Sequence, residues 1–132
     1  HYFRKHPIKL MLKNLLIVGA GGALGSIARF LIYFIFSKNI FSANTLIINI
    51  TGSFIIGILY ALSLKQNAVA ETTLLFLVTG ICGGYTTFST FSLENIQLLQ
   101  SGKILTAILY SLSSLAGGLL ACWLGYKLLQ VK

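Results

Sequence analysis

Four long apolar stretches, separated by short polar connections, dominate this chain and limit what it can fold into. They lie at about residues 15–36, 45–64, 73–99 and 104–128. Each holds roughly the 20 residues that an α-helix needs to cross the hydrocarbon core of a bilayer. Only 9% of the 132 residues are charged, whereas a soluble domain carries about 25%. The sequence therefore predicts an all-α membrane protein with four transmembrane helices.

The first ten residues differ from the rest of the chain. They contain Arg4, Lys5 and Lys9, both histidines and the only proline. From Met11 onward, a short basic lead precedes an apolar span, which is a common start for a membrane protein. We therefore predict that residues 1–10 are an extension that is not native, and that residues 11–132 form the four-helix domain.

Counted from Met11, the basic residues are distributed almost evenly between the two sides of the membrane, whereas including residues 4–9 restores a bias toward the side of the N-terminus. With four spans, one side carries four basic residues after Met11, namely Lys13, Lys65, Lys127 and Lys132. The other side carries Lys38 and Lys103, with Arg29 near that end of the first helix. This is a weak bias under the positive-inside rule, so the chain can be expected to insert in both orientations. Although the net charge is +8, these residues sit in tails and loops and do not alternate with aromatic residues, which argues against nucleic-acid binding.

The third span is interrupted by Gly83 and Gly84, and a run of threonines and serines comes after them. Adjacent glycines weaken a helix, and we predict a break near this pair. In lipid, a broken helix needs protein, water or an ion to satisfy its freed backbone groups. Half-helix ends of this kind bind ions in channels and transporters. The alternative is a glycine-rich packing seam whose hydroxyls bond back to carbonyls one turn earlier.

Phe88 and Phe91 lie three residues apart, on one helical face just after the expected break. The edge of an aromatic ring is positive and its face is negative. Ring edges that face a narrow path can therefore attract a small anion. Taken alone, two phenylalanines on a membrane helix are more often lipid-facing or core residues.

Two other spans carry polar residues at helical spacing. Thr45, Asn49 and Ser53 recur every four residues in the second span, and Thr106, Tyr110 and Ser114 do so in the fourth. Hydroxyl and amide groups can donate hydrogen bonds to a strongly hydrated anion that must shed its water. Any one of them could instead join two helices. Together with the third span, they favour a path lined by hydrogen-bond donors.

Other functions have less support. The glycines from Gly19 to Gly25 lack the GxGxxG spacing of a nucleotide loop, and we expect Gly21 and Gly25 to pack helices closely instead. The only acidic residues are Glu71, in a loop, and Glu94, near the end of the third span. We see no catalytic set, and no carboxylate where a proton-coupled exchanger would need one. Cys82 and Cys122 fit neither a metal site nor a disulfide framework.

Three segments together resemble the Fluc/CrcB family of fluoride channels. They are GGALGSIAR in the first span, Asn49 with TGSF (51–54) and Gly57 in the second, and GGYTTFSTFSLE (83–94) in the third. The resemblance runs from Met11 to the C-terminus. It implies a dual-topology homodimer of antiparallel four-helix subunits in the inner (plasma) membrane, surrounded by lipid. The expected activity is passive export of fluoride.

The resemblance also implies roles for individual residues. Phe88 and Phe91 match the aromatic residues that contact fluoride, and the hydroxyls of Thr87 and Ser89 lie in the same motif. Asn49, Tyr110, Ser114 and Thr45 match pathway positions, and Arg29 matches a vestibule arginine. The backbone carbonyls of Gly83 and Thr86 match those that hold a structural sodium ion at the dimer centre. Glu94 matches an acidic position whose role stays open, and Gly118 stands where a further serine would continue the polar track.

Two other classes of protein remain as alternatives. A small multidrug exporter of the four-helix type needs a glutamate in the first helix, where this chain has only Arg29. A non-conducting scaffold subunit would explain the small-residue seams but not the polar residues on three helices.

Overall fold

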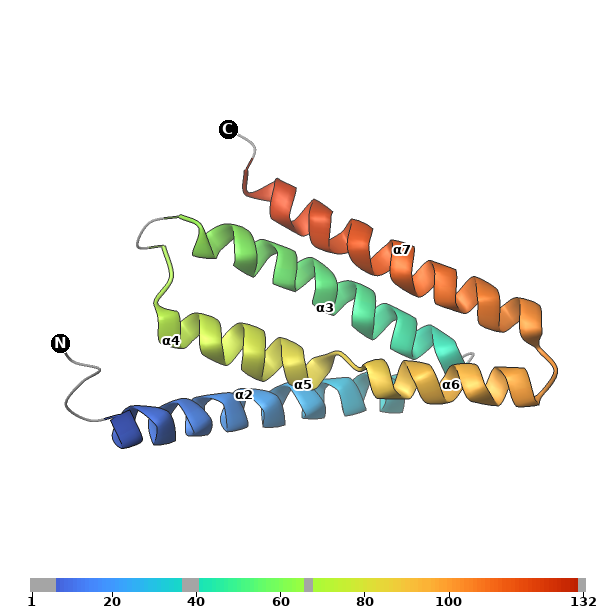
Figure 1. Ribbon diagram of the computed structural model, residues 1–132, viewed down its shortest axis with the longest axis horizontal. Helices are drawn as coiled ribbons and strands as arrows, with labels where there is room; N and C mark the ends of the chain where they lie inside the picture. The colour runs from blue at the N-terminus through green and yellow to red at the C-terminus, as the bar shows by residue number, and fades with distance from the viewer. Residues whose placement is uncertain (1–6, 37–40, 66–67, 131–132) are drawn as a thin grey trace.

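The computed structural model describes residues 7–36, 41–65 and 68–130, and within these ranges it is entirely helical apart from turns and one break (Figure 1). The first span is α2 (Pro7–Ile35), the second is α3 (Phe41–Ser63) and the fourth is α7 (Ile104–Leu128). The third comprises α4 (Glu71–Leu74), the π-helix η1 (Leu75–Cys82), α5 (Gly83–Tyr85) and α6 (Phe88–Gln100). Four helices in the described ranges are long and apolar enough to cross a membrane, which confirms the four predicted spans.

The first helix is longer than its apolar stretch suggested. α2 begins at Pro7, and a proline suits the first turn of a helix because its missing N–H would have had no partner there. The helix continues through Met11 without a change in structure. Residues 7–10 are therefore its first turn, while the rest of the predicted extension lies outside the described residues.

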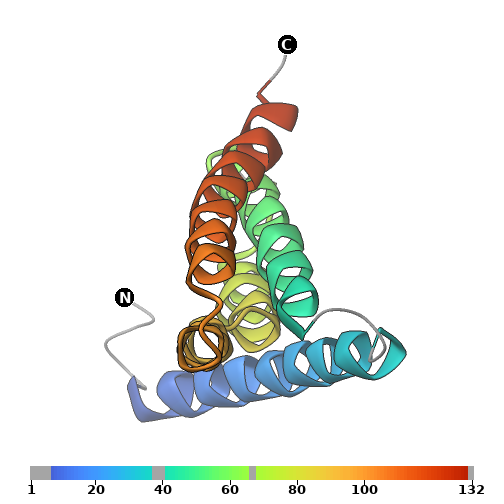
Figure 2. The same cartoon turned by 90° about the vertical axis from the view of Figure 1, so that its right-hand side faces the viewer.

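The helices pack as two close pairs, α3 with α7 and α2 with the first half of the third span (Figures 1 and 2). Glycines bring each pair together. A side chain on Gly57 would collide with the carbonyl of Cys122, and one on Gly25 would collide with the carbonyl of Ile81. Gly21 likewise lies against Gly80. The predicted packing role of Gly21 and Gly25 is thus confirmed, because small residues let helix backbones approach closely in lipid.

The segment Leu75–Cys82 is wound as a π-helix, in which each hydrogen bond reaches one residue further than in an α-helix. The N–H of Gly83, for example, bonds the carbonyl of Val78. The backbone that touches α2 recurs every four to five residues, at Phe76, then Gly80 and Ile81, then Gly84 and Tyr85. An α-helix repeats every 3.6 residues and would rotate this contact face away from α2. The π winding therefore keeps one face of the third span on α2 up to the break.

The break itself falls at Thr86 and Thr87, just after the glycine pair near which it was predicted. Both threonines are extended, with φ −76° and ψ 155° at Thr86 and φ −152° and ψ 116° at Thr87. Gly83 and Gly84 are still helical, and Gly84 packs against the carbonyl of Gly22. Gly84 thus serves the contact with α2, and the threonines carry the change of direction.

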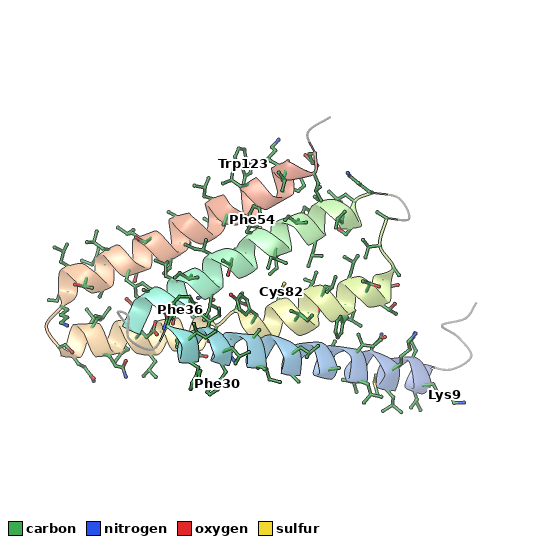
Figure 3. The ribbon with its side chains drawn as sticks, turned by 180° about the vertical axis from the view of Figure 1, so that it is seen from behind. Lys9, Phe30, Phe36, Phe54, Cys82 and Trp123 are labelled. Carbon is green, nitrogen blue, oxygen red and sulfur yellow. The ribbon has the colours of Figure 1, made fainter. Side chains whose placement is uncertain are left out.

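The outer surface of the bundle is apolar. Large side chains on α2 and α7 point away from the other helices, as Phe30 and Trp123 show in Figure 3, and these two are 66% and 53% exposed. Many leucines and isoleucines are similarly exposed on the same helices. A surface of this kind needs a lipid environment, so the chain is a multi-pass membrane protein.

Candidate functional site: a buried polar cluster beside the helix break

Asn49 on α3 satisfies the broken backbone. Its amide nitrogen donates to the carbonyl of Thr87 at 3.1 Å, and its amide oxygen accepts from the N–H of Thr87 at 2.8 Å. This reciprocal pair imitates the bonding of a second backbone strand. The polar side chain predicted on the second span therefore lies at the break, where freed backbone groups need partners.

Thr87 also begins the second half of the span. Its hydroxyl accepts a hydrogen bond from the N–H of Thr90 at 3.2 Å, which is the usual N-cap arrangement. The same hydroxyl lies 3.0 Å from the hydroxyl of Thr90 and 3.2 Å from that of Ser89. Three hydroxyl groups therefore gather at the first turn of α6. Thr87 is buried and Ser89 is exposed.

Glu94 lies at the centre of a buried cluster. Its side chain is 1% exposed, and each carboxylate oxygen accepts one hydroxyl hydrogen bond. Thr45 on α3 donates to one oxygen at 2.7 Å, and Tyr110 on α7 donates to the other at 2.6 Å. Because the single proton of Thr45 is used in this way, Tyr33 on α2 must donate in its hydrogen bond with Thr45. The cluster therefore joins all four spans.

Sequence patterns assign no role to Glu94 or Tyr33. From the sequence, Glu94 was placed only near the end of the third span. In the structure its side chain is buried inside the bundle, so the membrane-spanning part of the protein does contain a buried carboxylate. Burying such a group is costly unless it is hydrogen-bonded, and intramembrane acids commonly mark a functional site. Tyr33 lies four residues after Arg29, so both are on one face of α2. This spacing was the one sequence feature that could have pointed to Tyr33 as a member of the site. Arg29 is half-buried on this face.

A row of aromatic rings leads from this cluster to the outside of the subunit. Phe91 is half-buried, and its ring centroid lies 5.1 Å from that of Tyr110. Phe88 lies 5.6 Å from Phe91 and is 78% exposed. The two phenylalanines predicted to share a face therefore do so, and Phe91 also touches a residue of the polar cluster.

The fourth span contributes one buried polar residue and one buried hydroxyl group. Tyr110 is 6% exposed, and the hydroxyl of Ser114 is buried with no hydrogen-bond partner among the described residues. Thr106, which shares their spacing, is exposed instead. A side chain built on Gly118 would lie 3.6 Å from the hydroxyl of Ser53 on α3. The hydroxyl of Ser53 on α3 therefore lies next to Gly118, the position on α7 where a serine would have continued the row of polar residues.

Gly83 and Thr86 lie on the α2 side of the break. In an unbroken helix the carbonyl of Gly83 would accept from the N–H of Thr87, but that N–H bonds Asn49 instead. The N–H and the hydroxyl of Thr86 both donate to the carbonyl of Cys82 at 2.9 Å. No cluster of three or more histidine, cysteine or acidic side chains occurs in the part of the chain that the structure describes.

Fold and site together define a multi-pass helical membrane protein with a discontinuous third helix, an arrangement in which channels and transporters expose backbone groups to ions. The family model described as CrcB-like protein, Camphor Resistance (CrcB), matches residues 16–126. The chain therefore belongs to the CrcB family.

Its relatives match over nearly their full length. A protein of Azobacteroides pseudotrichonymphae is 45% identical over 91% of this chain and 98% of its own length. A protein of Flavobacterium psychrophilum is 46% identical over 86% of this chain and 94% of its own. Both are named fluoride-specific ion channel FluC.

Proposed function

We propose that this chain is a subunit of a fluoride-selective channel that lets fluoride leave the cytoplasm passively. The observation that carries the proposal is the meeting of hydroxyl donors from three helices beside an aromatic pair that reaches the outside of the subunit, inside a four-span bundle. The relatives are named fluoride-specific ion channels, which supports fluoride as the ion that this chain conducts. The cell interior is electrically negative, so an anion runs outward without coupling to another solute.

The path runs along the donors and the aromatic rings described above. Its members are Asn49, Thr45, Thr87, Ser89, Phe88, Phe91, Tyr110 and Ser114, and the half-buried Arg29 holds positive potential at the vestibule. Fluoride makes shorter and stronger hydrogen bonds than chloride because it is smaller. A narrow path of hydroxyl donors and ring edges therefore favours fluoride. The unpaired hydroxyl of Ser114 is a donor that such an ion can use.

Glu94 determines how these donors become available. The hydroxyls of Thr45 and Tyr110 are directed at its carboxylate. Fluoride on this path must therefore compete with the carboxylate for the same donors. An ion that forms weak hydrogen bonds competes poorly, which adds to the selectivity against chloride.

The conducting unit in this proposal is an antiparallel, dual-topology homodimer in the inner (plasma) membrane. Counted from Met11, the basic residues are nearly evenly distributed between the two sides, which supports insertion in both orientations. A sodium ion at the dimer centre would be held by the carbonyls of Gly83 and Thr86 from each subunit. The fit is reasonable, because the break deprives the Gly83 carbonyl of its helical donor and carbonyl oxygens suit hard cations.

The decisive experiment measures anion efflux from proteoliposomes with fluoride- and chloride-selective electrodes. Wild-type protein should release fluoride and retain chloride. The double variant Phe88→Ile/Phe91→Ile should lose fluoride efflux while remaining folded. The matched control is Phe30→Ile/Phe34→Ile, because these two rings are also neighbours, with centroids 6.4 Å apart, but both are exposed on the outer face of α2. Unchanged efflux in the first variant would refute the aromatic assignment, and no fluoride efflux from wild type would refute the function.

The buried carboxylate of Glu94 favours one competing function, proton-coupled fluoride exchange. The two functions differ in what drives the flux. In vesicles with no pH gradient, a channel responds to a membrane potential imposed with valinomycin and potassium. An exchanger instead moves fluoride in response to a pH gradient at zero potential and carries protons with it.

A further inference from the structure

Tyr33 lies near the end of α2, outside the three spans whose polar side chains were expected to line the path. Its hydroxyl oxygen is 2.5 Å from that of Thr45 on α3. Only residues 36–40 separate the two helices, so the end of α2 can lie beside the start of α3. Arg29 precedes Tyr33 by one helical turn on the same face. Tyr33 therefore joins the face of α2 that carries Arg29 to the buried cluster around Glu94.

The hydrogen bonds from Tyr33 to Glu94 run in one direction. A threonine hydroxyl has one proton to donate and can also accept hydrogen bonds. The carboxylate of Glu94 can only accept, and it takes the proton of Thr45 at 2.7 Å. The oxygen of Thr45 is left as an acceptor, and Tyr33 is its donor. Each bond in such a chain polarises the next, so donation by Tyr33 makes Thr45 a stronger donor.

Thr45 has another way to use its proton. A threonine within a helix can turn its hydroxyl back to the carbonyl four residues earlier. Thr51, further along α3, donates in this way to the carbonyl of Ile47 at 2.8 Å. Thr45 is fully buried and donates to Glu94 instead. Two partners hold it away from its own backbone, because the carboxylate takes its proton and Tyr33 donates to its oxygen.

We propose that Tyr33 is a positioning residue of the fluoride path, which directs the proton of Thr45 at the place where fluoride displaces the carboxylate. The inference rests on the proposed function and adds a residue of the first helix to it. When fluoride takes the proton of Thr45, the threonine oxygen is still satisfied by Tyr33. Without the tyrosine hydroxyl, that buried oxygen loses its donor, and the threonine is free to bond its own backbone.

Efflux from proteoliposomes separates positioning from a merely structural role. The amplitude of fluoride efflux measures the fraction of vesicles that contain a folded channel, whereas its rate measures conduction per channel. Tyr33→Phe should slow efflux about twofold to tenfold, the equivalent of one neutral hydrogen bond, and leave the amplitude unchanged. The matched control is Tyr60→Phe, an exposed tyrosine near the other end of α3, which should behave as wild type. A wild-type rate in Tyr33→Phe, with or without a lower amplitude, would overturn the proposal.

Two backgrounds test whether Tyr33 acts through Thr45. Thr45→Val has nearly the same shape but no hydroxyl, and adding Tyr33→Phe should not slow efflux further. Thr45→Ser retains the hydroxyl, and adding Tyr33→Phe should slow efflux as it does in the wild type. Equal slowing in the Thr45→Val background would overturn the positioning role, because Tyr33 would then act on the ion without Thr45. No slowing in the Thr45→Ser background would overturn it as well.

The contact between the two side chains can be measured without fluoride. Equilibrium unfolding in mixed micelles compares wild type, Tyr33→Phe, Thr45→Val and the double variant. If the two hydroxyls are bonded, the unfolding constant of the double variant should be about twofold to tenfold smaller than the two single effects together predict. Fully additive effects would overturn the contact. Because this readout does not involve conduction, coupling in a protein that conducts no fluoride would refute the proposed function and leave the contact standing.

Discussion

Replacing Asn49 with leucine removes two hydrogen bonds from the backbone at the break. The bonds measure 3.1 Å and 2.8 Å and satisfy the carbonyl and the N–H of Thr87. Leucine is similar to asparagine in size but cannot bond either group. A buried polar group without a partner costs about 1–3 kcal/mol. If both groups lose their partner, the free energy of unfolding should fall by about 2–6 kcal/mol.

Equilibrium unfolding in mixed micelles, monitored by the fluorescence of Trp123, measures this loss. Asn49→Gln retains both the donor and the acceptor of the amide and should lose less stability than Asn49→Leu. Gln97→Leu, at an exposed position on α6, is the control and should be nearly neutral. A change below about 0.5 kcal/mol for Asn49→Leu, the size of an ordinary surface substitution, would refute the role of Asn49 in satisfying the break.

Three further predictions test the site and the winding of the third span. Tyr110→Phe keeps the ring beside Phe91 but removes the donor to Glu94, and should slow fluoride efflux from proteoliposomes by about tenfold, the equivalent of 1.4 kcal/mol. Ser53→Ala should slow efflux severalfold, and adding Gly118→Ser should restore it, because the two positions are neighbours; no rescue would contradict a shared role. Deletion of Thr79 should leave a folded dimer by size-exclusion chromatography. Removing one residue shortens the spacing of the contacts with α2 to about that of an α-helix, so η1 can become α-helical and keep the same face on α2. Deletion of Ile58 from α3, which has no π-helix to absorb the change, should not leave a folded dimer.

Features that depend on local composition are well predicted by the sequence. The four spans come directly from apolar length, since the bilayer sets the length of a helix. The close packing of Gly21 and Gly25 reflects the preference for small residues where helices meet in lipid. The break was also expected, but placed slightly early, because glycine weakens a helix wherever it occurs. Here both glycines remain helical, with Gly84 packed against α2, and the N-cap of Thr87 determines where the helix restarts.

Features that depend on several helices were beyond the sequence. Nothing near Glu94 in the chain indicates that Thr45 and Tyr110 will reach its two oxygens. A hydroxyl side chain on a membrane helix has the same local pattern whether it lines a path, bonds a carboxylate or bonds its own backbone. The π-helix is equally hidden, because its winding responds to contacts on α2 and not to a residue preference of its own.

The position of Glu94 changes how a path of donors can be selective. Free hydroxyls in a membrane would be unsatisfied and would attract water, and a wet path discriminates poorly between anions. A buried carboxylate that accepts from Thr45 and Tyr110 keeps the donors satisfied and correctly oriented while no ion is present. A passing anion must then form hydrogen bonds strong enough to replace those of a carboxylate. In the proposed channel, the cluster would therefore set the minimum hydrogen-bond strength that an anion needs to enter.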